Sequence, residues 1–255
     1  MILELFKLDN KVALVTGAGR GLGQAMAVAL AEAGADVAGL DVIPLDETAA
    51  QVQALGRRFL PLNANLLEAH ADDVTKVVEQ VVAGLGSLDI LVNNAGIIRR
   101  APVLEFSEKD WDDVMQINLK AVFLLSQAAG RVMVEHGKGK IINIASMLSF
   151  QGGIRVPSYT ASKSGVAGIT RLMANELAAR GLNINAIAPG YMATDNTAPL
   201  RADAERAPAI LDRIPAGRWG EPADLMGAVV FLASAASDYM TGQVVYVDGG
   251  RSCTA

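Results

Sequence analysis

The chain has 255 residues, of which 51% are apolar and 19% charged, with a net charge of −5 at pH 7. This composition can bury a sizeable core and is too apolar for a disordered protein. The acidic balance, without any basic block, argues against nucleic acid or an anionic membrane as the main partner.

Short β-branched runs alternate with longer helical patterns along the whole chain. Strands are predicted at residues 12–16, 36–41, 58–63, 88–93, 140–145, 183–188 and 243–247, and helices at 21–33, 67–84, 107–136, 156–180 and 222–234. The strands are apolar on both faces, which is typical of a parallel sheet covered by helices on both sides. We therefore expect an α/β fold, a single-domain Rossmann-like doubly wound parallel sheet of about seven strands over residues 1–255.

Two local patterns add detail to these elements. The sequence SEKD at 107–110 resembles a capping box and places the start of the fourth long helix. Residues 190–220 are irregular and rich in Pro and polar side chains, with one helix predicted near 202–213. Long excursions of this kind are usually functional lids, so a substrate lid is expected there, with a tolerated surface insertion as the alternative.

A glycine-rich sequence, TGAGRGLG at 16–23, lies between the first predicted strand and an Ala-rich helix. Glycines at such a turn let the backbone approach a pyrophosphate at the helix N-terminus. Asp41 ends the second predicted strand, about 20 residues past Gly21, where a carboxylate that binds the adenosine ribose is expected. These features together predict a dinucleotide-binding site.

Asp41 and Arg20 point to different cofactors. A carboxylate at position 41 repels the 2′-phosphate of NADP, whereas Arg20 can pair with it. An unpaired like-charge contact costs more than an exposed Arg–phosphate pair gains, so NAD is expected and NADP remains possible.

Further motifs extend the pattern through the chain: NNAG at 93–96, Asn118, Ser146, YTASK at 159–163 and PGYMAT at 189–194. With the glycine-rich loop, and in this order, they resemble the short-chain dehydrogenases/reductases over residues 11–250. The resemblance implies a nicotinamide-dependent oxidoreductase that acts on CH–OH groups and forms a homotetramer.

The residues of the YTASK motif suit acid/base chemistry. Tyr159 and Lys163 are spaced i, i+4, so both side chains lie on one face of a helix. A nearby ammonium is expected to lower the pKa of the phenol toward a useful value. Ser146, just past the fifth strand, can hydrogen-bond the reacting oxygen. The resemblance adds Asn118 as the support of a proton relay through water and Lys163.

The resemblance also implies cofactor-binding roles across the chain. It places the NNAG residues on the adenosine side, Lys163 at the nicotinamide ribose, and the PGYMAT residues at the nicotinamide amide. Where relatives often have an Asp against adenine, this chain has Asn65, which can still hydrogen-bond. The expected cofactor set is Gly17, Arg20, Gly21, Leu22, Gly23, Asp41, Asn65, Leu66, Asn93, Ala95, Gly96, Tyr159, Lys163, Pro189, Gly190, Met192 and Thr194.

Loop sequences narrow the resemblance to the branch of the family that acts on deoxy-sugar acids. The matching stretches are IIRRAP at 97–102, SMLSFQGGIRVPSYTASKSG at 146–165, APGYMATDNTAPLRAD at 188–203 and RIPAGRWGEP at 213–222. An Arg fork can hold a substrate carboxylate, with Arg155 the first candidate and Arg100 the weakest. The expected substrate set is Arg99, Ser146, Gln151, Arg155, Tyr159 and Asn196.

Two other functions stay open at this point. One is a reductase of the same family for another polyol, a steroid or a carrier-bound 3-ketoacyl substrate. The other is a non-enzymatic nicotinamide-binding sensor, which the intact set of Ser146, Tyr159 and Lys163 disfavours.

Metal and membrane roles find no support in the sequence. The histidines, His70 and His136, lie far apart on polar helix faces, and Cys253 is the one cysteine, so no metal site or internal disulfide is expected. The N-terminus lacks a secretory cleavage pattern, and the apolar stretch near 225–236 is too short to cross a bilayer. A cytoplasmic protein is expected.

Overall fold

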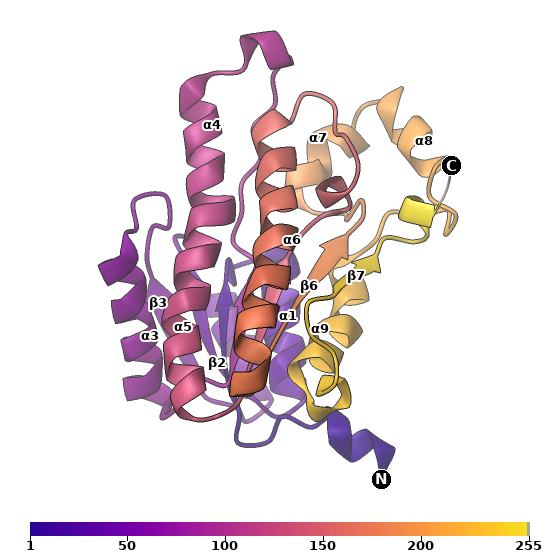
Figure 1. Ribbon diagram of the computed structural model, residues 1–255. Helices are drawn as coiled ribbons and strands as arrows, with labels where there is room; N and C mark the ends of the chain where they lie inside the picture. The colour runs from indigo at the N-terminus through magenta and orange to yellow at the C-terminus, as the bar shows by residue number, and fades with distance from the viewer. Residues whose placement is uncertain (254–255) are drawn as a thin grey trace.

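The structure is a computed structural model and describes residues 1–253. Its centre is one sheet of seven parallel strands in the order β3-β2-β1-β4-β5-β6-β7, which confirms the expected doubly wound fold (Figure 1). The strands are β1 (Val12–Thr16), β2 (Asp36–Asp41), β3 (Phe59–Asn63), β4 (Ile90–Asn93), β5 (Gly139–Ile144), β6 (Leu182–Pro189) and β7 (Val244–Val247).

The helices connect successive strands and cover the sheet. They are α1 (Gly21–Glu32), α2 (Asp46–Ala54), α3 (Ala71–Leu85), α4 (Glu108–Met115), α5 (Val122–Glu135), α6 (Pro157–Leu177), α7 (Ala198–Arg201), α8 (Arg206–Leu211) and α9 (Met226–Ala233). A π-helical segment (Gln116–Ala121) joins α4 to α5, so the three form one continuous helical run.

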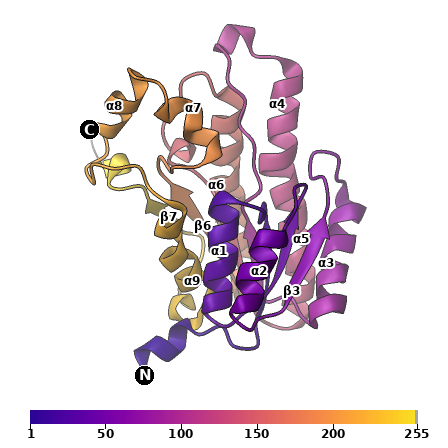
Figure 2. The ribbon, with the colours of Figure 1, turned by 180° about the vertical axis from the view of Figure 1, so that it is seen from behind.

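Two apolar layers hold the helices to the sheet. Helices α3, α5 and α6 cover the face seen in Figure 1, and α1, α2 and α9 cover the face seen in Figure 2. Successive side chains of a strand point to opposite faces, so Leu14 packs into the first layer and Val15 into the second, both fully buried. The apolar character of both strand faces follows from this double cover.

The strand order places a crevice beside β1. The chain runs from β1 outward through β2 to β3 and then returns to β4 on the other side of β1. The loops that follow β1 and β4 therefore diverge at their carboxyl ends. Such a switch point is where ligands bind in open α/β sheets.

The helix predictions needed three corrections. Helix α2 was missed, because it is short and largely polar. Helix α3 begins after His70, whose backbone N–H donates to Asp73 at 3.0 Å, so residues 67–70 are not helical. The helix predicted near 202–213 is shorter: α8 begins only at Arg206, because the Asp203 carboxylate accepts from the backbone of Arg206 at 2.9 Å, and the separate helix α7 precedes the predicted range.

The helical run Glu108–Glu135 has the length and hydropathy of a membrane-spanning helix, but half of its most apolar window is buried within the fold. Leu125 and Met133 of α5 lie in the core beneath the sheet. Packing of a core helix accounts for its apolar composition.

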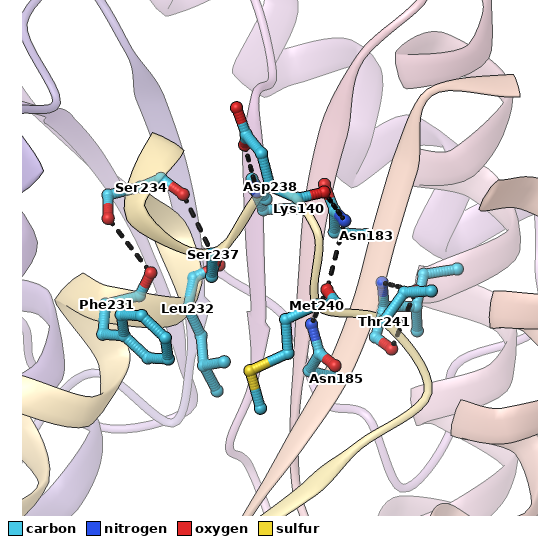
Figure 3. A network of polar contacts seen from close by, with 11 residues as sticks. Lys140, Asn183, Asn185, Phe231, Leu232, Ser234, Ser237, Asp238, Met240 and Thr241 are labelled. Carbon is cyan, nitrogen blue, oxygen red and sulfur yellow. Dashed lines mark hydrogen bonds and ion pairs between the residues drawn. The ribbon is translucent and has the colours of Figure 1, made fainter. Parts of the chain in front are cut away.

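The segment before β7 is fastened to the amino ends of β5 and β6 by a polar network (Figure 3). Lys140 forms an ion pair with Asp238 at 2.7 Å. The Asn185 side chain donates to the Met240 carbonyl at 2.8 Å, and the Asn183 side chain donates to the same carbonyl at 3.1 Å. This network stabilises the edge of the sheet at the end opposite the crevice.

Candidate active site

A pocket of about 340 Å³ opens at the carboxyl ends of the strands, beside the junction of β1 and β4. That volume is within the usual range for a small-molecule site. Its lining includes many of the residues predicted from the sequence, from six separate segments: Gly17, Arg20, Gly21, Leu22, Gly23, Asp41, Asn65, Leu66, Ala95, Gly96, Tyr159, Lys163, Thr194 and Asn196.

The glycine-rich loop forms an anion-binding end of this pocket. Gly17 and Gly21 have φ values of 66° and 58°, which favour glycine, and a Cβ on Gly23 would lie 1.9 Å from the Gly17 carbonyl oxygen. No side chain of the described residues caps α1, and its first turn carries no acidic residue. The N–H groups of that turn are therefore available to a pyrophosphate.

Asp41 lies at the neighbouring edge of the pocket. Its carboxylate accepts hydrogen bonds from the backbone of Gly19 at 2.9 Å and of Val42 at 2.7 Å. The carboxylate thus holds the glycine-rich loop against the end of β2, at the expected position of the adenosine ribose. Arg20 extends from the same loop and forms an ion pair with Asp195 at 2.7 Å.

Tyr159 and Lys163 lie together in the pocket wall, as their spacing on α6 predicts. The Lys163 Nζ lies 5.7 Å from the centroid of the Tyr159 ring. The ammonium is buried and donates to the Ile144 carbonyl at 2.6 Å. Ser146, next to the end of β5, hydrogen-bonds the Tyr159 side chain.

The expected direction of the Tyr159 pKa is wrong in this structure. Burial raises the pKa of Tyr159 above 10.0, while the hydrogen bond with Ser146 and the positive charge of Arg100 act in the lowering direction. Burial also lowers the pKa of Lys163 from 10.5 to about 8. Removal from water disfavours the charged form of both groups and is the largest influence on the pKa of each.

Asn118 lies behind the pocket wall, in the π-helical segment. Its amide accepts from the Ile97 backbone N–H and donates to the Ile97 carbonyl, both at 2.9 Å, and it also contacts the Ser162 hydroxyl at 3.3 Å. π-Helical segments are rare and are frequently found at functional sites. Asn118 thereby holds the loop after β4, whose residue Ile97 lines the pocket.

Four expected cofactor residues lie outside the pocket lining. The buried Asn93 amide donates to Ser126 and Asn143 at 2.9 Å each, so it joins β4 to α5 and β5; Asn94 lines the pocket in its place. Gly190 lies against the backbone of Asp248, and Met192 is buried in a bridge to Gly220. The fourth, Pro189, ends β6.

The positions of the candidate arginines change their order as candidates for substrate binding. Arg99 forms an ion pair with Asp110 at 3.2 Å, and Arg155 has a left-handed backbone with φ of 65°. Neither these two nor Gln151 line the pocket. Arg100, ranked weakest in sequence, donates to the Asn196 carbonyl at 3.0 Å, and its charge acts on Tyr159. No sequence signal separates Arg99 from Arg100, because the direction of a loop side chain is not periodic.

Comparison with known proteins gives a consistent match over the whole chain. The family model for short chain dehydrogenases matches residues 11–205. The chain is 63% identical over 251 residues to the 2-dehydro-3-deoxy-D-gluconate 5-dehydrogenase of Escherichia coli (strain K12), covering 98% of each protein.

Two solved structures are also similar. One, assigned as a 2-deoxy-D-gluconate 3-dehydrogenase of Agrobacterium tumefaciens with bound NADP, is 53% identical with a TM-score of 0.92, covering 98% of this chain and 99% of that one. The other, a gluconate 5-dehydrogenase of Burkholderia cenocepacia J2315 in complex with NADP and tartrate, is 39% identical with a TM-score of 0.94, covering 100% of both chains.

Proposed function

The chain belongs to the short-chain dehydrogenase family, and from this premise we propose that it interconverts a secondary alcohol and a ketone on a deoxy-sugar acid with NAD. Its substrate would be that of a 2-dehydro-3-deoxy-D-gluconate 5-dehydrogenase, also called 2-deoxy-D-gluconate 3-dehydrogenase, as in its relatives. The main support for this proposal is the position of Tyr159, which lies in the pocket wall beside Ser146 and is influenced by the positive charge of Arg100.

The pocket fits a nicotinamide dinucleotide. The uncapped, acid-free N-terminus of α1 suits a pyrophosphate, and the carboxylate of Asp41 suits ribose hydroxyls. Asn65 and Leu66 line the adenosine side, and Lys163 and Thr194 the other end. Bound there, the nicotinamide ring supplies the hydride acceptor for oxidation and the donor for reduction.

Tyr159 carries the proton in this mechanism. During oxidation its phenolate takes the hydroxyl proton of the substrate, and during reduction its phenol returns a proton to the carbonyl oxygen. Ser146 holds the same oxygen by a hydrogen bond. With a pKa of about 8, Lys163 exchanges protons near neutral pH. A relay through water, with Asn118 holding the loop at Ile97, links it to solvent.

Arg100 provides the charge for the substrate carboxylate. It lies at the Tyr159 end of the site and is tied to Asn196, a pocket residue that can bond substrate hydroxyls. Arg99, Gln151 and Arg155 lie outside the pocket lining and would contact only the part of the substrate that extends beyond it. Residues 190–220 would close over the bound substrate as a lid. Tartrate, bound to the Burkholderia cenocepacia relative, is likewise a hydroxy acid.

The cofactor preference is set by Asp41, which favours NAD, although NADP is bound in three related structures. We assign the enzyme to the cytoplasm as a homotetramer. Its partner is a small sugar acid rather than nucleic acid or a membrane, and the net charge of −5 supports that assignment.

The test is turnover of the purified protein. NAD with 2-dehydro-3-deoxy-D-gluconate, and NADH with the corresponding 2,5-diketo acid, are expected to react, while Tyr159→Phe is expected to be inactive. A wild-type rate no higher than that of Tyr159→Phe would refute the sugar-acid substrate. Panels of other polyols, steroids and 3-ketoacyl thioesters test the alternative reductase, and cofactor binding without any turnover would favour the sensor.

A further inference from the structure

An ion pair crosses the mouth of the dinucleotide pocket. Arg20 comes from the glycine-rich loop and Asp195 from the segment that follows β6, and their side chains meet at 2.7 Å. Both residues line the pocket. They are 175 positions apart in the chain, so the fold alone brings them together.

Arg20 is the cation on the adenosine side of this pocket. Among the described lining residues, the positive side chains are Arg20 and Lys163, and Lys163 is buried at the other end against Ile144. Arg20 follows Gly19, whose N–H is bound by the Asp41 carboxylate. A 2′-phosphate on the adenosine ribose would therefore meet Asp41 directly and would need Arg20 as its counter-charge.

We propose that Asp195 is a cofactor-specificity residue, which disfavours NADP by holding Arg20 in an ion pair across the pocket mouth. This inference rests on the proposed dinucleotide site. A 2′-phosphate can recruit Arg20 only by separating it from Asp195, so the energy of that ion pair is lost when NADP binds. NAD carries no 2′-phosphate and leaves the pair intact. Asp41 acts on the cofactor itself, whereas Asp195 is a positioning residue that acts through Arg20.

Other contacts hold the Asp195 segment in place. Arg100 donates to the Asn196 carbonyl at 3.0 Å, and Arg201 donates to the Thr194 carbonyl at 3.3 Å. Loss of the Asp195 charge therefore frees Arg20 without releasing the segment from the pocket.

Direct binding tests this inference without any substrate. The dissociation constants of NADH and NADPH are measured from the fluorescence of the reduced nicotinamide for the wild type, Asp195→Asn, Arg20→Ala and the double variant. Glu205→Gln is the matched control, because Glu205 is an exposed acid in the same segment outside the pocket lining. Its removal changes the net charge equally without touching Arg20.

We expect Asp195→Asn to lower the ratio of the NADPH to the NADH dissociation constant about two- to fivefold, which corresponds to the free energy of an exposed ion pair. The change in this ratio should be smaller at high salt. Glu205→Gln should leave the ratio unchanged, and Arg20→Ala should abolish the effect of Asp195→Asn. An unchanged ratio in Asp195→Asn, or the same effect with Arg20 absent, would overturn the inference. A wild type that binds neither cofactor would overturn the proposed function as well.

Discussion

Replacement of the buried lysine should stabilise the fold while removing the proposed chemistry. Lys163 is 4% exposed, and burial lowers its pKa from 10.5 to about 8. At about 1.4 kcal/mol for each pH unit, the buried charge costs about 3 kcal/mol below pH 8. Lys163→Met removes that cost and loses the hydrogen bond to Ile144, worth about 1–2 kcal/mol. We expect a net gain of about 1–2 kcal/mol at pH 7.

The pH dependence gives this prediction its sign. Above pH 8 the folded protein releases the Lys163 proton, whereas the unfolded chain keeps it up to about pH 10.5. The unfolded state then binds more protons, so wild-type stability rises with pH relative to Lys163→Met. The advantage of the variant should fall by about 3 kcal/mol across that window, at about 1.4 kcal/mol for each pH unit, and reverse near the middle of it, at about pH 9.

Urea unfolding at pH 7, 8, 9 and 10, at one protein concentration, measures this difference. Lys76→Met, at an exposed position on α3, controls for the loss of a lysine at the surface. A Lys163→Met protein less stable than the wild type at pH 7, or a difference that stays flat between pH 8 and 10, would refute the reasoning. Retained turnover in Lys163→Met would separately refute its proposed catalytic role.

Three further substitutions probe the rest of the site. Asp41→Ala should shift the ratio of kcat/KM toward NADP about five- to tenfold, and Asp41→Asn separates the charge from the loop hydrogen bonds; an unchanged ratio would show that Asp41 is not the selector. Arg100→Met should raise the KM of the sugar acid about 10- to 100-fold. It should also move the pH profile of oxidation to higher pH, because the positive charge that lowers the Tyr159 pKa is lost. An unchanged pH profile would contradict this influence of Arg100 on Tyr159. Gly23→Ala should abolish NADH binding in a fluorescence titration, because its Cβ would collide with the Gly17 oxygen. The control Gly227→Ala, whose Cβ meets nothing within 4 Å, should retain NADH binding and stabilise α9 by about 0.5–1 kcal/mol. Equal NADH binding by the two variants would exclude the steric explanation.

The fold could be predicted because its signal is repeated along the chain. Each buried strand and each long amphipathic helix carries its own pattern, so an error of a residue or two at an end leaves the β–α order intact. Helix α2 escaped detection because it has few apolar residues and packs against the sheet mainly through Val52 and the hydroxyl of Thr48, which donates to the Ala18 carbonyl at 2.7 Å. That partner lies outside the helix and cannot be inferred from periodicity.

Geometry of the proposed catalytic pair could likewise be predicted, but its electrostatics could not. A spacing of four residues on one helix is enough to place Tyr159 beside Lys163. The sign of the Tyr159 pKa shift depends on how much water the surrounding segments exclude, and those segments come from distant parts of the sequence. Burial decides the sign here, with Ser146 and Arg100 opposing it.

Loop arginines mark the limit of prediction from sequence. Arg99 and Arg100 are adjacent, yet Arg99 pairs with Asp110 in α4 while Arg100 reaches the segment after β6. The partner of Arg99 is close in sequence, whereas Arg100 is directed by a residue 96 positions away, as Arg20 is by Asp195, 175 positions away. Residues 194–196 therefore contact two arginines, Arg20 from the glycine-rich loop and Arg100 from the loop after β4. An anion that binds either arginine must compete with residues 194–196, so substrate binding and cofactor binding would both act on this one segment.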